Sequence, residues 1–164
     1  MSKLDVDQIL DDYESSRQRE AEKQRQALED ERTALMVQAR RLVAAFQDII
    51  LPVFNQVESN ICGRGYFCQI ETTRRKHPQL GDTTFEISIK LSTTAGSDRI
   101  DASYLAYEGD IEKVTITKIV LIQRPPHKGP EKSPAVPLSS LDADRVQEDL
   151  EAFLRVIFPA EPDK

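Results

Sequence analysis

The chain has 164 residues and a formal net charge of −6, with 30% charged and 39% hydrophobic residues. Such an acidic chain does not attract phosphate backbones through its average field, so nucleic acid is not expected as a partner unless a local basic patch supplies the charge. No apolar segment follows the Met1-Ser2-Lys3 start or approaches the roughly 18 apolar residues of a membrane span, which predicts a cytoplasmic protein without a membrane partner.

A seven-residue repeat organises the N-terminal part and predicts one long helix over about 5–60. Its two rows are Ala21, Leu28, Leu35, Leu42, Ile49 and Gln18, Arg25, Arg32, Ala39, Phe46. The repeat is half polar at its N-terminal end and apolar at its C-terminal end. We therefore expect 1–33 to form a projecting polar helix, a candidate coiled coil, that enters a globular body at residue 34. The leucines of the repeat, Leu28, Leu35 and Leu42, are the candidate self-association residues.

An apolar cluster at the start of this helix has no apolar neighbour in sequence that would bury it. Its members, at helical spacing, are Val6, Ile9, Leu10 and Tyr13. They are the candidate residues for docking a partner, in the manner of an amphipathic helix. A frayed terminus is the alternative. Ser2 or Asp5 is expected to cap the helix.

From Ala34 the apolar face becomes broad, as in a helix that packs on a sheet. Pro52 lies inside this face, and its ring removes a helical hydrogen bond. We expect the helix to continue through residue 58 with a kink, with a break at Leu51 as the alternative.

Strands are predicted at 66–72, 84–93, 100–107 and 112–124, where apolar and polar residues alternate. Short turns at 95–98 and 108–110 and a loop at 73–82 connect them. Neighbours in sequence usually pair, so these strands predict a four-stranded antiparallel meander, and 34–124 forms a body of helix and sheet.

A proline-rich segment, 125–138, is predicted to be an extended linker. Ser139 or Ser140 is then expected to cap a last helix over 139–158, which Pro159 ends before a short tail at 159–164. The linker can return this helix to the sheet. The fold class is therefore α+β, with a C-terminal helix packed on the sheet.

One dense basic cluster, Arg74, Arg75 and Lys76 followed by His77, lies in the predicted loop at 73–82. These residues are the candidate contacts for an anion or nucleic acid. A solvated hairpin loop whose cations discourage edge-to-edge pairing is the alternative.

The sequence contains no recognisable catalytic, metal or cofactor motif. Cys62 and Cys68 have no common zinc spacing, and only His77 and His127 are available to complete a ligand set. Cys68 follows the apolar side of a predicted strand, which is typical of a small core residue. No nucleophile signature such as Gly-x-Ser-x-Gly occurs. We therefore expect no catalytic residue, no metal and no cofactor.

These observations favour a non-enzymatic interaction or adaptor protein that self-associates as a homodimer and uses amphipathic helices for assembly or partner docking. One alternative is a small acidic secretion-type chaperone, because size, acidity and layout are loosely similar to type III secretion chaperones, although no residue motif carries that likeness. The other alternative is a ligand- or nucleic-acid-binding module that uses the loop from Arg74 to His77.

Overall fold

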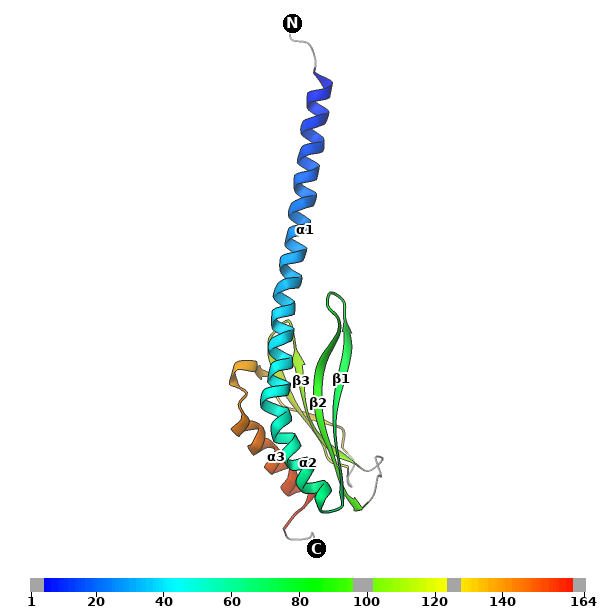
Figure 1. Ribbon diagram of the computed structural model, residues 1–164, viewed down its shortest axis with the longest axis vertical. Helices are drawn as coiled ribbons and strands as arrows, with labels where there is room; N and C mark the ends of the chain where they lie inside the picture. Colours follow the sequence, from blue (N-terminus) through cyan, green and yellow to red (C-terminus); the bar gives the residue numbers. More distant parts are fainter. Residues whose placement is uncertain (1–4, 96–101, 124–127, 161–164) are drawn as a thin grey trace.

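One long helix rises out of an α+β body (Figure 1). The computed structural model describes residues 5–95, 102–123 and 128–160. Helix α1 (Val6–Ala45) begins after Asp5, whose Oδ1 accepts a hydrogen bond from the backbone N–H of Gln8 at 3.0 Å. This bond satisfies one of the free amides of the first turn, so Asp5 is the N-cap.

The helical region continues through a π-helical turn, Phe46–Ile50, into α2 (Leu51–Gly63). In this turn the N–H of Leu51 bonds to the carbonyl of Phe46. Pro52 lies in the first turn of α2, where the missing N–H of its ring costs little. The predicted kink is therefore a widened turn before the proline, and the helical region ends at Gly63, later than predicted.

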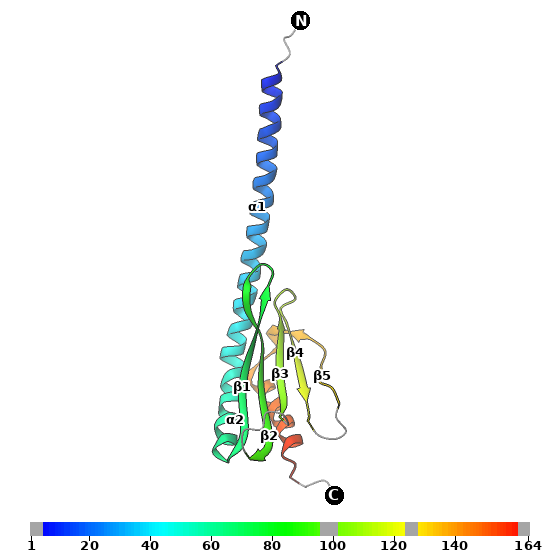
Figure 2. The ribbon, with the colours of Figure 1, turned by 90° about the vertical axis from the view of Figure 1, so that its right-hand side faces the viewer.

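An antiparallel sheet of six strands forms the second layer of the body. Its first four strands make the predicted meander, and Figure 2 shows them side by side. They are β1 (Tyr66–His77), β2 (Gly81–Ala95), β3 (Ser103–Asp110) and β4 (Thr115–Leu121). β1 and β2 are longer than predicted because their pairing continues up to His77 and Gly81.

The predicted number of four strands is wrong, because two short strands come from the expected linker at 125–138. They are β5 (Glu131–Lys132) and β6 (Val136–Pro137), and both pair with β4. The N–H of Ser133 donates to the carbonyl of Lys118 at 2.9 Å. Prolines lack an N–H, but their neighbours can still bond to an edge strand, which is where prolines are tolerated.

The turn between β3 and β4 lies at 111–114, directly after the predicted turn at 108–110. Asp110 sets its position, because Oδ1 accepts hydrogen bonds from the N–H of Glu112 at 3.0 Å and of Lys113 at 3.1 Å. Val114 closes the turn with a φ of 52°, a conformation that costs a β-branched residue energy. Gly109 is consequently a strand residue, paired with Ile116.

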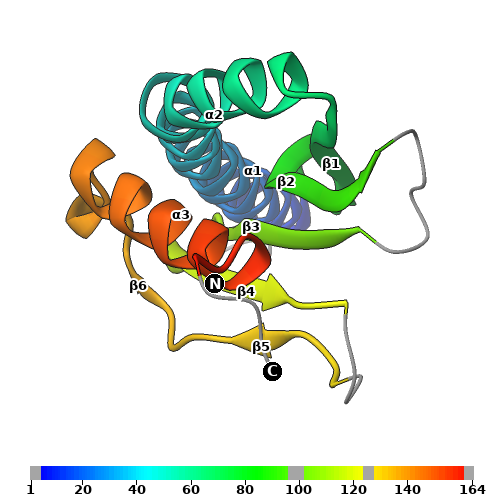
Figure 3. The same cartoon turned by 90° about the horizontal axis from the view of Figure 1, so that it is seen from below.

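The helices cover one face of the sheet (Figure 3). Tyr107 of β3, which is 2% exposed, connects the layers. Its ring lies 6.2 Å from the ring of Phe54 on α2, and its hydroxyl donates a hydrogen bond to Asp149 Oδ2 on α3 at 2.7 Å. The core therefore lies between this sheet face and the helices α1, α2 and α3 (Ala143–Ile157).

Helix α3 begins after Asp142, whose Oδ1 accepts a hydrogen bond from the N–H of Arg145 at 2.8 Å. Ser139 and Ser140, the predicted caps, lie instead in a 3₁₀ turn, Leu138–Ser140. The predicted turn residues 96–98, the predicted strand start at 100–101 and the predicted strand end at residue 124 lie outside the described residues.

Candidate functional site

The N-terminal part of α1 projects from the body as an exposed helix. Every residue over 5–34 is exposed, and Leu35 is the first buried residue of α1. At a rise of about 1.5 Å per residue, the segment 6–34 is about 43 Å long. Side-chain bonds one turn apart support it, as from Gln8 Nε2 to Asp12 Oδ1 at 3.0 Å. We call residues 6–34 the projecting segment.

An apolar stripe lies at the tip of the projecting segment. Its members, between 50% and 59% exposed, are Val6, Ile9, Leu10 and Tyr13. These positions recur at helical spacing and therefore lie on one face. We call them the tip stripe. It consists of the four residues that the sequence marks for partner docking, and the helix presents all of them to solvent.

The three candidate self-association leucines have different surroundings. Leu28 is 63% exposed on the projecting segment. Leu35 and Leu42 are buried in the core of the same chain, with exposures of 9% and 2%. Because the sheet already covers Leu35 and Leu42, Leu28 alone of the three presents its side chain to another molecule.

The basic cluster does not lie in a loop as predicted, because β1 continues through Arg74, Arg75 and Lys76 to His77. The register shifts at Thr73–Arg74, where Phe85 of β2 has no paired residue. A bulge of this kind places two residues opposite one and changes the direction of side chains. Here Arg75 lies over the ring of Phe85, with its guanidinium carbon 3.7 Å from the ring centroid.

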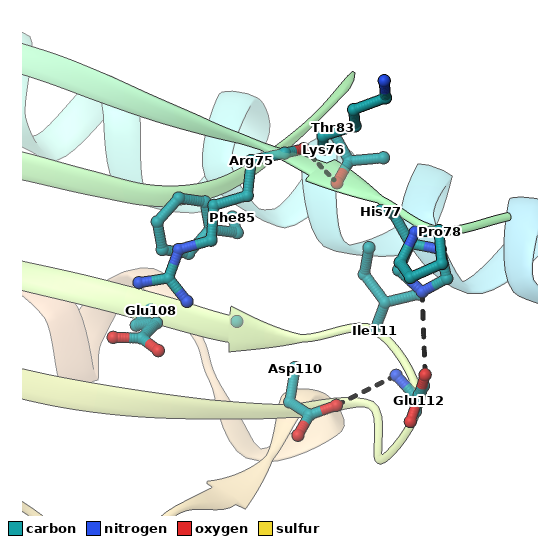
Figure 4. Close-up of a pocket in the computed structure, with 11 residues that line it drawn as sticks. Arg75, Lys76, His77, Pro78, Thr83, Phe85, Glu108, Asp110, Ile111 and Glu112 are labelled. Carbon is teal, nitrogen blue, oxygen red and sulfur yellow. Dashed lines mark hydrogen bonds and ion pairs between the residues drawn. The ribbon is translucent and has the colours of Figure 1, made fainter. Parts of the chain in front are cut away.

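A cavity of about 270 Å³ lies beside this bulge (Figure 4). It is lined on one side by Arg75, His77 and Phe85 and on the other by acidic residues. The facing acidic residues are Glu108, Asp110 and Glu112. Cations and carboxylates thus share the cavity, and the carboxylates weaken the positive potential that a phosphate group needs.

Two glutamates oppose one another near the cavity. Glu86 of β2 pairs with Glu108 of β3 in the strand register. Burial raises the pKa of Glu86 above its usual value and repulsion from Glu108 raises it further, while Arg75 and Lys90 oppose the shift. The predicted alternation of β2 places Glu86 on the correct face of the sheet. Its partner Glu108 was missed, because the sequence predicts a turn at 108–110.

The two cysteines are free thiols at the junction of α2 and β1. Cys62 is exposed, and its Sγ lies 3.7 Å from the carbonyl oxygen of Cys68. Burial raises the pKa of Cys68 to about 12, with smaller contributions from Cys62 and Glu58. Cys68 packs against the core, in agreement with its predicted place on the apolar side of the strand.

Three hydrogen-bonded polar side chains, which the sequence did not predict as a group, join α3 to the sheet. Asp149 accepts hydrogen bonds from the Tyr107 hydroxyl at 2.7 Å and from Lys118 Nζ at 3.1 Å. Burial and the bond to Asp149 raise the pKa of the Tyr107 hydroxyl, which therefore remains a donor. The three residues are far apart in sequence, and only the packing of α3 brings them together.

Over the described ranges, the side chains form no group of three or more His, Cys, Asp or Glu residues that would hold a metal ion. Within the same part of the chain, none of the helices has the length and apolar character needed to cross a membrane. No protein-family model, curated protein or solved structure matches the chain.

Proposed function

We propose that this protein is a non-enzymatic interaction protein that self-associates through the exposed face of α1. The observation that supports it is the continuity of one helix face. With about 100° of rotation per residue, Val6 and Leu28 lie within about 40° of the buried Leu42. The face that packs on the sheet therefore continues along the projecting segment to the tip stripe, with Gln24, Ala21 and Arg17 between Leu28 and Tyr13.

The size of this exposed face favours a protein partner. An isolated apolar residue on a surface needs no explanation, but a row of large apolar residues on a projecting helix marks an interaction site. A second helix of the same kind would cover it as in a coiled coil. A second copy of the chain supplies such a helix, which is why we propose a homodimer.

Light scattering on the full chain over a range of concentrations tests this proposal. Wild type is expected to reach the mass of a dimer as its concentration rises. The double variant Ile9→Asp with Leu10→Asp is expected to stay monomeric, because charged side chains on the seam must be desolvated on association. The matched control is Gln8→Asp with Ser15→Asp, which adds the same residue type on the opposite face.

A monomeric wild type at every concentration would overturn the proposal. Equal dimerisation of the tip-stripe variant and wild type would place the interface elsewhere on the molecule and overturn the assigned surface. Loss of the dimer in the control variant as well would show a general effect of charge on the helix.

The cavity at the bulge favours ligand binding as a second candidate function, because Arg75 and Lys76 line it; Arg74 precedes them on the same strand. Replacing Arg74 and Arg75 by alanine is expected to abolish salt-sensitive binding of a short single-stranded DNA if this strand contacts phosphate groups. Binding that survives the change excludes the strand as the contact. The secretion-type chaperone remains the other alternative and requires an unfolded client on the helix face.

A further inference from the structure

The buried part of α1 fixes which positions of the projecting segment share one face. The buried or partly buried residues Leu35, Ala39 and Leu42 of α1, and Phe46 at the start of the π-helical turn, pack on the body. Continuing the same spacing outward gives the positions Leu28, Gln24, Ala21, Arg17, Tyr13, Leu10 and Val6. This face follows an eleven-residue repeat, because a straight helix drifts by about 20° from a seven-residue repeat in each heptad.

The spacing of these positions is the same whether the segment is followed from Val6 or from Leu28. From Val6 to Leu28 the steps are 4, 3, 4, 4, 3 and 4 residues, with Arg17 at the centre. A second copy that runs the opposite way therefore places every position of this face against another one. We propose that two copies of α1 pair antiparallel about Arg17, with the tip stripe of each copy covered by the segment around Leu28 of the other.

This arrangement rests on the proposed self-association and adds its direction and register. The facing layers are Val6 with Leu28, Leu10 with Gln24 and Tyr13 with Ala21 of the second copy, so the bulky Tyr13 meets a small residue and Leu10 meets a polar one. Each residue of the tip stripe thereby packs against α1 of the second copy, whereas no described part of its own chain covers it. In a parallel pair, Tyr13 would face Tyr13, and two bulky side chains would compete for one layer.

Charge separates the two directions more strongly. The first ten residues of this region, 5–14, carry Asp5, Asp7, Asp11, Asp12 and Glu14 and no basic residue. The segment that faces it in the antiparallel pair, 20–29, carries Lys23 and Arg25 together with Glu20, Glu22 and Glu29, a net charge of −1. Copies that run parallel would place one acidic tip against the other. Antiparallel copies place each tip, of charge −5, against a segment of charge −1 that contains Lys23 and Arg25, so repulsion between tips disfavours the parallel alignment.

The flanks of the face give the same result. Asp7 and Arg25 lie on one flank, each about 100° from Val6, and Asp12 and Lys23 lie on the other. Equivalent flanks meet in an antiparallel pair, so Asp7 faces Arg25 and Asp12 faces Lys23 of the second copy. Opposite flanks meet in a parallel pair, where Arg25 would face Asp30 but Asp7 would face Asp12, one attraction and one repulsion.

The central layer sets the register. The two Arg17 side chains meet there, each with Glu14 and Glu20 one turn away on its own helix. A polar layer of this kind lowers stability but fixes alignment. The length of the exposed helix also fits, because the tip of one copy ends opposite Leu28, before the buried Leu35. The two bodies then lie at opposite ends, with their Leu35 residues about 54 Å apart along the helices.

Disulfide trapping of the full chain tests the direction. In a Cys62→Ser background, we would mix Tyr13→Cys and Ala21→Cys proteins and let glutathione disulfide oxidise the thiols at neutral pH. Each inter-chain bond oxidises two thiols and reduces the glutathione disulfide to two glutathione thiols. The expected product is the mixed 13–21 dimer alone, since facing positions bring the two sulfur atoms within bonding distance. Ser15→Cys, on the opposite face, is the matched control and should form no disulfide-linked dimer, either with itself or with one of the other two variants.

Disulfide-linked dimers of Ala21→Cys with itself, in excess over the mixed product, would show a parallel pair and overturn the inference. A dimer by light scattering without the mixed product would overturn the register but leave self-association in place. A wild type that is monomeric at all concentrations would overturn both. These outcomes separate the failure of the arrangement from the failure of the proposed function.

Exchange of two charges provides a second measurement. Asp12→Lys alone and Lys23→Asp alone are each expected to weaken the dimer by roughly threefold to tenfold, since each turns two attractions into repulsions. The chain that carries both changes is expected to recover wild-type affinity, because each copy again offers one acid and one base. Failure of the double variant to recover, after both single variants weaken the dimer, would overturn the antiparallel pairing.

Discussion

Leu42 of α1 lies directly on Gly109 of β3. A Cβ atom added to Gly109 would lie 2.8 Å from Leu42 Cγ, closer than the 3.0 Å below which a neighbour has to move. Leu42 is 2% exposed and belongs to the core cluster, so any shift of its side chain is toward other core residues. The absence of a side chain at Gly109 therefore sets how closely α1 approaches the sheet.

Gly109→Ala is expected to lower the free energy of unfolding by about 1–3 kcal/mol, the usual cost of overpacking a core. Urea denaturation followed by circular dichroism measures the change. Gly63→Ala is the matched control, since nothing lies within 4 Å of a Cβ there and Gly63 is the last residue of α2. Replacing a helical glycine is expected to stabilise the control by up to about 1 kcal/mol.

Leu42→Ala in the Gly109→Ala background provides the independent check. Leu42→Ala alone is expected to cost about 2–5 kcal/mol. The double variant should cost less than the sum of the single variants, because the added methyl group fills part of the space that Leu42 leaves. Strict additivity would show that the two residues do not press on one another.

Tyr107→Phe is expected to lower the free energy of unfolding by about 1–3 kcal/mol, because it leaves Asp149 Oδ2 without the donor that lies 2.7 Å away. Tyr66→Phe is the control, since Tyr66 is 38% exposed and its hydroxyl should contribute little to stability. Urea denaturation of both variants measures their free energies of unfolding. Equal stability of Tyr107→Phe and wild type would show that the hydrogen bond from Tyr107 to Asp149 contributes nothing to the docking of α3.

The alternation of side chains made the main layers of the fold predictable. Phe85, Ile87, Ile89 and Leu91 identify β2, and the broad apolar face after Ala34 identifies the buried part of the long helix. Turn positions were less predictable. A glycine usually marks a turn, but Gly109 is a strand residue because Leu42 occupies its side-chain space. Asp110 carries the actual turn signal through its bonds to the next amides.

Features that depend on contacts far apart in sequence were not predictable. The bulge at Phe85 arises from the register of β1 against β2, whose pairing continues through Arg75 and places this side chain over the ring of Phe85. Asp149 lies on a helix whose docking position only the core determines. The position of the tip stripe on one exposed helix face, in contrast, was predictable, because residues three and four apart lie on the same face of any helix, while its role in docking stays a prediction.

Cysteine reactivity tests the junction of α2 and β1. Iodoacetamide at pH 8 is expected to modify Cys62 rapidly and Cys68 slowly, because the thiolate is the nucleophile and burial raises the pKa of Cys68 to about 12. Peptide mapping by mass spectrometry over time distinguishes the two sites. Unfolding in urea should make their rates similar. Rapid modification of Cys68 in the native protein would contradict its packing against the core.

The paired glutamates predict a specific pH dependence of stability. The pKa of Glu86 is raised from 4.5 in the folded state, first by burial and then by Glu108. The folded state therefore holds this proton more tightly than the unfolded state does, so stability falls as pH rises from 4.5 through the folded pKa. Well below pH 4.5, Glu86 is protonated in both the folded and the unfolded state, and its charge no longer destabilises the fold.

Glu86→Gln removes this ionisation and is expected to unfold at higher urea concentration than wild type at pH 7. The difference should shrink to its smallest value near pH 3.5, where Glu86 is neutral in both states. Urea denaturation of both proteins across this range measures it. Glu148→Gln, at an exposed position of α3, is the control for losing one carboxylate. A difference between Glu86→Gln and wild type that stays constant with pH would instead reflect altered packing or hydrogen bonding of the amide. A destabilised variant at pH 7 would mean that attraction to Arg75, Lys132 and Lys90 outweighs the cost of burial and the repulsion from Glu108.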